Sequence, residues 1–205
     1  MQESISLFSL FMLGGPVMWP LLVLLVAVTV IIVERTILLI RSDLRPGQGA
    51  KAALDIYKTQ GKEEAIRFCE EPENLWGEAV STALDCQGGC ARAMGMARIR
   101  GEEAVARLER PLSYLDMISS VAPILGFLGT VTGMISAFKS IAEANTVQLQ
   151  LVAAGLYEAL FTTAFGLIIA VAATIAAHIF RQFIDTYELE QEHALAAVEA
   201  TVRLS

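Results

Sequence analysis

Two long apolar stretches separated by a short polar interval are the strongest constraint on how this 205-residue chain can fold. Residues 117–138 contain no Asp, Glu, Lys, Arg or His, and residues 151–180 contain only Glu158 and His178 of these types. A run of about 18 or more apolar residues crosses the roughly 30 Å hydrocarbon core of a bilayer as one helix. The sequence therefore predicts transmembrane helices at 112–139 and 151–180, joined by a turn at 140–150.

A third apolar stretch lies near the start of the chain, at residues 14–33. Its aliphatic residues cover every side of a helix, which predicts lipid on most faces and the role of a membrane anchor. Trp19 suits an interfacial position at its outer end. The preceding residues 1–13 contain neither Lys nor Arg, unlike a secretory signal. We interpret them as an amphipathic segment on the membrane surface.

The composition also favours a membrane protein, since 55% of the residues are hydrophobic and 18% are charged, whereas soluble domains average about 25% charged residues. Basic residues gather after the first span, before the second and after the third, with only Lys139 beside the 140–150 turn. The positive-inside rule then places the N-terminus and the turn on the outer side of the membrane, which would be the periplasm in a bacterium with two membranes. Residues 34–111 and 181–205 are expected in the cytoplasm.

The two predicted cytoplasmic segments have apolar residues at helical spacing, which indicates helices that continue the membrane spans. The expected fold is an all-α membrane protein whose three transmembrane helices extend into a cytoplasmic helical bundle. No phosphate-binding loop, Ser-His-Asp set or zinc-protease signature is present. The chain is therefore expected to have no catalytic residues and not to be an enzyme.

Charge and cysteine content narrow the expected partners. A net charge of −7 argues against nucleic acid, which requires a basic surface to neutralise phosphates. Cys86 and Cys90 share a helix face, but no His or second Cys pair completes a zinc-binding set. Ordinary thiols are the favoured interpretation. No metal or other cofactor is expected.

Small residues occupy one side of each helix of the predicted hairpin. At 100° per residue, Gly155 and Gly166 share a side of the third span with alanines and threonines, opposite its large aliphatic residues. The second span has the same pattern at Gly126, Gly129 and Gly133. Helix association in lipid depends on close backbone packing, so these faces are predicted to meet protein.

Glu158 is the only acidic residue within the three apolar stretches 14–33, 117–138 and 151–180. An ionised carboxylate inside a bilayer costs about 2.5–3.5 kcal/mol or more on insertion scales, so Glu158 is expected to face water, a partner or other protein. The alternative is that Glu158, about two turns from the outer end, reaches the interface. Thr130, Thr162 and Thr163 also have two interpretations: their hydroxyls line a water file, or they bond to carbonyls of their own helices.

Three segments resemble the MotA/TolQ/ExbB proton-channel family, and its ExbB and TolQ members in particular. They are GGPVMWPLLVLL at 14–25, APILGFLGTVTGM at 122–134 and EALFTTAFGL at 158–167. The resemblance implies a homopentamer in the inner membrane of a Gram-negative-type bacterium. It also implies that the second and third helices line a central pore around a dimer of single-span partners of the ExbD/TolR type, which carry the proton-bearing aspartate.

By this resemblance, Thr130 and Thr163 match the family's pore threonines and Glu158 matches its glutamate. The chain is then the channel wall and stator of a motor that uses the proton motive force to energise biopolymer or protein transport, or another outer-membrane process, with a TonB-like or TolA-like protein as a further partner. Two alternatives stay open. One is a MotA-like flagellar stator, which is disfavoured because its fourth span and larger cytoplasmic domain are not seen in this sequence. The other is a structural membrane scaffold without proton flux.

Overall fold

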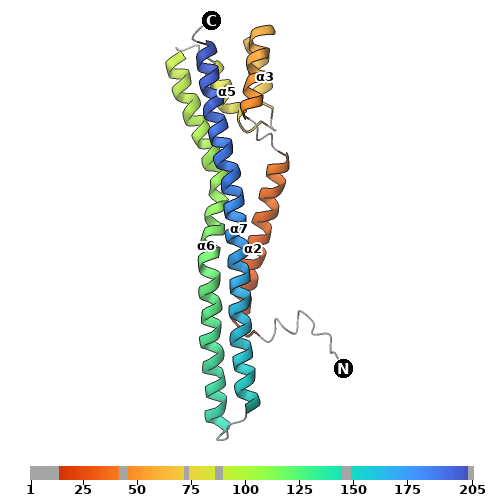
Figure 1. The fold of residues 1–205 in the computed structure, drawn as a ribbon, viewed down its shortest axis with the longest axis vertical. Helices are drawn as coiled ribbons and strands as arrows, with labels where there is room; N and C mark the ends of the chain where they lie inside the picture. Colours follow the sequence, from red (N-terminus) through yellow and green to blue (C-terminus); the bar gives the residue numbers. More distant parts are fainter. Residues whose placement is uncertain (1–13, 42–45, 72–73, 86–89, 145–148, 203–205) are drawn as a thin grey trace, which may run out of the picture. The chain divides into compact units, whose positions relative to one another are not determined.

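The computed structural model describes residues 14–41, 46–71, 74–85, 90–144 and 149–202. Within these ranges the chain forms helices and no strand (Figure 1). The helices are α2 (Met18–Arg41), α3 (Pro46–Thr59), α4 (Lys62–Cys69), α5 (Gly77–Leu84), α6 (Cys90–Ala144) and α7 (Leu149–Val202). The predicted surface segment at 1–13 lies outside the described residues.

Three of these helices are long and apolar enough to cross a membrane, over Met18–Ile40, Ala91–Glu143 and Val152–Thr201. The predicted all-α membrane fold with three spans is confirmed. Helices α6 and α7 have 55 and 54 residues, or about 80 Å each at 1.5 Å per residue. Because the hydrocarbon core is only about 30 Å thick, each helix continues well beyond a single crossing.

The chain divides into two compact units. Unit 1 comprises Met1–Ile32 and Ser113–Ala177, and unit 2 comprises Val33–Leu112 and His178–Ser205. These divisions fall within three residues of the predicted cytoplasmic end of each span, at residues 33, 112 and 180. The position of the membrane itself stays a prediction. Both long helices therefore contribute to both units.

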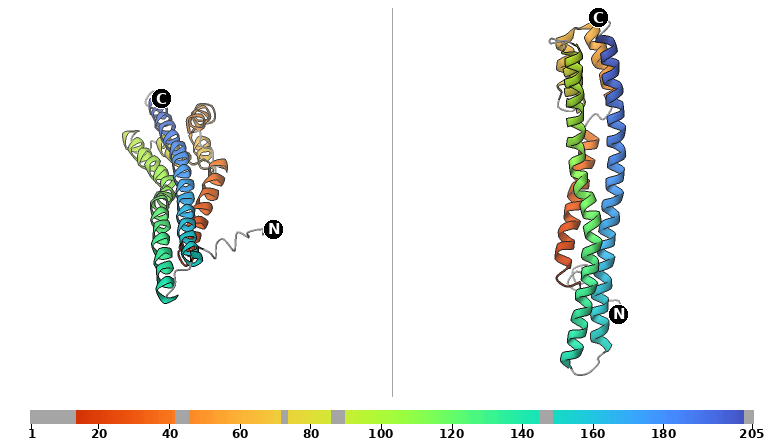
Figure 2. Two further views of the ribbon diagram at one scale, coloured as in Figure 1. Left: turned by 60° about the horizontal axis from the view of Figure 1, so that its bottom comes forward. Right: turned by 90° about the vertical axis from the view of Figure 1, so that its left-hand side faces the viewer.

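In unit 1, residues 113–144 of α6 and 149–177 of α7 lie side by side in all views (Figures 1 and 2). Small side chains are buried between them, whereas large aliphatic ones face outward. Ala159 and Ala173 are at most 2% exposed, but Leu160 and Ile168 are more than 60% exposed. This division follows the helical period of 3.6 residues and matches the two sides predicted for the third span.

In unit 2, the short helices pack around a buried tryptophan. Trp76 is fully buried, its ring lies 6.1 Å from that of Phe68, and it rests directly on Gly49 of α3. Gly61 separates α3 from α4 and has a φ of +100°, a conformation that glycine adopts without steric cost. The helices α3 and α4 lie on either side of Gly61, as expected of a predicted helical cytoplasmic segment.

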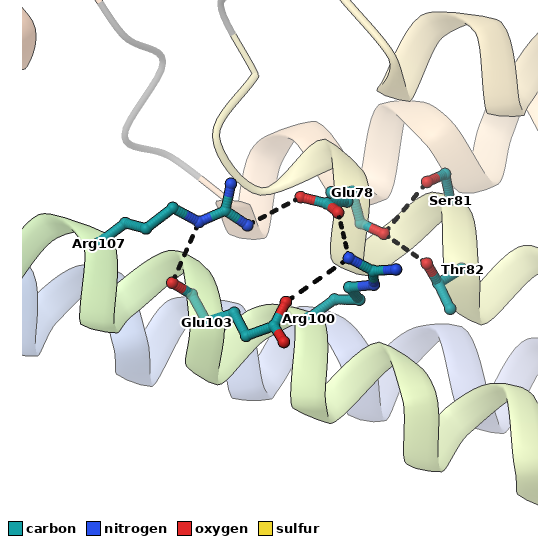
Figure 3. A network of polar contacts seen from close by, with 6 residues as sticks. All are labelled: Glu78, Ser81, Thr82, Arg100, Glu103 and Arg107. Atoms are coloured by element: carbon teal, nitrogen blue, oxygen red, sulfur yellow. Dashed lines mark hydrogen bonds and ion pairs between the residues drawn. The ribbon is translucent and has the colours of Figure 1, made fainter.

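An ion-pair network joins α5 to the first part of α6 (Figure 3). Glu78 accepts hydrogen bonds from Arg100 at 2.9 Å and from Arg107 at 3.1 Å. Arg100 also lies 3.5 Å from Glu103. All four side chains are roughly half exposed, so solvent screens the network and its contribution to stability is modest.

Candidate functional site

The candidate site is the surface along which α6 and α7 pack in unit 1, here called the α6–α7 seam. At Gly133 and Gly155 each glycine comes close to the other's carbonyl oxygen, since a Cβ built on either would lie 2.9 Å from it. At Gly166 a Cβ would lie 2.5 Å from the carbonyl oxygen of Ala122. Two helices can approach this closely only where side chains are absent. The small-residue faces of the two helices thus meet each other.

The predicted threonines lie at one level of this seam. A Cβ on Gly126 would be 3.1 Å from both the Thr162 carbonyl oxygen and the Thr163 Cα. The hydroxyl of Thr162 rests directly against Gly129, next to Thr130 in the chain. The seam therefore brings Thr162 and Thr163 of α7 against Gly126 and Gly129 of α6, and Thr130 is the next residue along α6.

The three hydroxyls have different partners. Thr130 donates a hydrogen bond to the Phe127 carbonyl at 2.7 Å, within its own helix. Thr162, fully buried, donates to the carbonyl of Ala159 at 2.9 Å. Thr163 donates across the seam to the carbonyl of Gly126 at 3.0 Å and is also 3.3 Å from that of Ala159.

Own-helix bonds were one of the two interpretations that the sequence offered for these threonines, and their role in a water file stays a prediction. Thr130 and Thr162 bond to carbonyls of their own helices in this structure, as serines and threonines in helices commonly do. Thr163 has an acceptor in its own helix, the Ala159 carbonyl, and a nearer one across the seam, the Gly126 carbonyl, so it also links α6 to α7. Its half-buried position leaves its oxygen a lone pair for a further donor, such as water.

Glu158 lies one helical turn from Thr162 and is half-buried. Its carboxylate lies against Gly15, in the turn that precedes α2. Among the residues that the structure describes, no lysine, arginine or histidine forms an ion pair with Glu158. A carboxyl group one helical turn from the Thr162 hydroxyl can bind water, but these two groups alone do not form a continuous relay.

Sequence reasoning missed Gly14 and Gly15 as members of this neighbourhood. A Cβ on Gly14 would overlap the Met18 side chain and lie 3.4 Å from Cγ2 of Thr162, while one on Gly15 would overlap Oε1 of Glu158. In the sequence the Gly-Gly pair indicated only a break before the helix of the first span. Thr162 and Glu158 are more than 140 residues away, so no local pattern indicated those contacts.

Unit 2 offers no comparable group among its described residues. Burial raises the pKa of the Cys69 thiol to about 12, with a smaller contribution from the nearby Glu70 carboxylate, which makes this cysteine a poor nucleophile. Within the described part of the chain, no three His, Cys, Asp or Glu side chains are grouped as a metal site. Cys86 lies outside it.

Fold and site together define a membrane protein built on a closely packed helix pair, with threonine hydroxyl groups at one level and a carboxyl group about one helical turn away. Residues 88–193, slightly more than half of the chain, match the MotA/TolQ/ExbB proton channel family. The chain belongs to this family. The match covers α6 and most of α7, and therefore the whole seam.

Several curated proteins are similar to this chain. It is 42% identical over 88 residues to the Tol-Pal system protein TolQ of Pseudomonas aeruginosa, covering 43% of this chain and 37% of that protein. It is 37% identical over 110 residues to the biopolymer transport protein ExbB of Salmonella typhimurium, covering 53% of this chain and 45% of that protein. These two alignments span less than half of either relative. The putative biopolymer transport protein ExbB-like 3 of Synechocystis is 26% identical over 185 residues, 88% of each chain.

Proposed function

We propose that this protein is the channel-wall and stator subunit of a bacterial inner-membrane complex that couples proton entry to transport or to another outer-membrane process. In this proposal Thr130, Glu158, Thr162 and Thr163 line the proton pathway, and the glycines of the seam hold α6 and α7 at the required separation. The chain acts without an enzymatic step and without a cofactor, and the proton is the transported ion.

One observation carries the proposal. Glu158 and the cross-helix bond from Thr163 to Gly126 lie about one turn apart on a helix pair that matches a proton channel family. Placing a carboxyl group inside a membrane costs free energy, so a carboxyl group retained there indicates a function. Because no second ionisable side chain of the described residues pairs with Glu158, the pathway requires a carboxyl group from another chain.

The implied partner is a single-span protein of the ExbD/TolR type whose membrane carboxyl group completes the relay. Several copies of this chain, five by family resemblance, surround a dimer of that partner within the lipid. A TonB-like or TolA-like protein then receives the mechanical output. Moving one proton across 100 mV supplies about 2.3 kcal/mol, so a few protons per step suffice to rotate one set of helices against the other.

The test compares proton uptake into right-side-out membrane vesicles that contain the chain and its native partners, measured with a pH-sensitive dye in the lumen. Glu158→Ala and Thr163→Val are each expected to lower uptake by about tenfold or more, which corresponds to raising the barrier to proton passage by about 1.4 kcal/mol. Thr29→Val is the matched control, because Thr29 lies in α2 and bonds only to the Leu25 carbonyl of its own helix, at 2.8 Å. It is expected to leave uptake unchanged.

Two results would contradict the proposal. Undiminished uptake with both Glu158→Ala and Thr163→Val in one chain would favour a scaffold without proton flux. Uptake that follows a sodium gradient in place of a proton gradient would refute the assignment of the ion while retaining the channel wall.

A further inference from the structure

The turn before α2 makes a close contact with Glu158. Gly15 has a φ of +65°, in the left-handed region that favours glycine. A Cβ built on Gly15 would overlap Oε1 of Glu158 and lie 3.0 Å from its Cδ and 3.8 Å from its Cγ. The outer half of the Glu158 side chain therefore lies directly across the backbone of Gly15. We call residues 14–17, with this contact, the Gly14–Gly15 turn.

The Gly14–Gly15 turn also anchors the start of α2 inside unit 1. Val17, Met18 and Leu21 are at most 8% exposed, whereas Trp19 and Val23 are more than half exposed. Apart from Val28, the buried residues of α2 that belong to unit 1 lie in its first turn. The first span is thus exposed along most of its length and held at the end that contacts α7.

The residue at position 15 must satisfy two independent structural requirements. A residue there must adopt a positive φ, and it must leave free the space that the carboxylate occupies. Only glycine satisfies both without a cost. Since the described residues supply no cation to orient Glu158, the steric contact with the turn is what limits where its carboxylate can point.

We propose that the Gly14–Gly15 turn is a positioning element for Glu158: it covers one side of the carboxylate and fixes its direction beside Thr162. Its effect on proton uptake rests on the proposed function above. The contact itself can be tested without any measurement of flux, so a failure of one proposal is distinguishable from a failure of the other.

The direct test measures modification of Glu158 by dicyclohexylcarbodiimide, which reacts with protonated carboxyl groups in membranes. The full chain is treated in native membranes and analysed by mass spectrometry, with Glu158→Gln as the background. Gly15→Ala is expected to raise the labelling rate of Glu158 by about tenfold, because overpacking by one methyl group drives the carboxylate out from under the turn.

Gly61→Ala is the matched control. Gly61 also has a positive φ, +100°, but a Cβ there would meet no atom within 4 Å. The substitution introduces the same kind of backbone strain without displacing any side chain, and labelling of Glu158 is expected to stay at the wild-type rate. An equal rate in Gly15→Ala and in wild type would overturn the proposal, whatever the effect of either variant on flux.

A second pair of variants keeps the proposal testable if Gly15→Ala accumulates poorly. Glu158→Asp shortens the side chain by one methylene and vacates the space that the new methyl group needs. The double variant is therefore expected to accumulate better than Gly15→Ala alone, and Gly15→Ala should reduce proton uptake less when combined with Glu158→Asp than when introduced alone. If the two substitutions instead lower accumulation and uptake independently, the turn has only a general structural role and the proposal is wrong.

Discussion

The backbones of α6 and α7 approach each other most closely where Gly166 meets Ala122, so one added methyl group at Gly166 is predicted to lower the stability of the fold markedly. A Cβ there would lie 2.5 Å from the Ala122 carbonyl oxygen and 3.2 Å from the Gly126 Cα, whereas ordinary contact begins at 3.4 Å. The helices must separate by close to 1 Å, because backbone atoms cannot rotate aside as a side chain can. Overpacking of this kind costs about 1–3 kcal/mol.

The matched control for Gly166→Ala is Gly95→Ala, which lies within α6 and has no atom within 4 Å of the added Cβ. Alanine favours a helix over glycine by up to about 1 kcal/mol at both positions, so this contribution cancels in the comparison. Gly166→Ala is therefore expected to be about 1–3 kcal/mol less stable than Gly95→Ala. Gly126→Ala, where the nearest contacts are 3.1–3.3 Å, should lie between them.

The assay is denaturant unfolding of the full chain in lipid nanodiscs, followed by the loss of helical circular dichroism. The expected order of stability is Gly95→Ala, then Gly126→Ala, then Gly166→Ala. Equal stability of the first and last variants would show that α6 and α7 do not approach each other at Ala122 and Gly166. The packing argument for the seam would then be refuted.

Three further predictions concern unit 2. Because burial raises the pKa of Cys69 to about 12 from 9.0, maleimide labelling of the folded protein near pH 8 should be about a thousandfold slower than labelling in denaturant. The stability that the neutral thiol contributes should be complete below about pH 9 and fall as pH rises toward 12, which a pH series of unfolding curves would measure. The hydroxyl of Tyr187 is buried without a hydrogen-bond partner among the described residues, so Tyr187→Phe should leave the unfolding free energy unchanged or raise it by about 1 kcal/mol, and a clear loss of stability would contradict this. In the Glu78 network, a double-mutant cycle of Glu78→Gln and Arg100→Gln should give a coupling energy of at most about 1 kcal/mol that becomes smaller in 1 M salt. A larger coupling energy that does not depend on salt would mean that the ion pair is less exposed than in this structure.

Much of unit 1 could be predicted from local sequence patterns. A bilayer of fixed thickness requires long apolar helices, so the three spans follow from length and composition alone. The helical period then sorts the residues of the third span, and it placed Ala173 on the buried side and Ile168 on the exposed side, as the structure does. The same patterns singled out Glu158 and the three threonines as candidate site residues, whose role in a proton pathway stays a prediction.

The helical period could not set the register between the two helices. The sequence offered Thr163 an acceptor in its own helix or a water file, but its bond across the seam to Gly126 depends on a register that also sets Gly133 opposite Gly155. That register is a property of two surfaces packing together. Neither sequence segment contains it.

The first span illustrates the same limit. Its apolar residues on all sides correctly indicated a helix with most of its faces exposed, because side chains on the surface of a helix match the medium around it. It could not indicate that the Gly14–Gly15 turn lies on Glu158, since that contact joins residues 143 positions apart. Sequence by itself determined which segments are helical and which faces are small, charged or apolar, because these depend on near neighbours in the chain. Tertiary structure decided which of those faces meet and which backbone atom each polar group reaches, because such contacts depend on how distant segments pack.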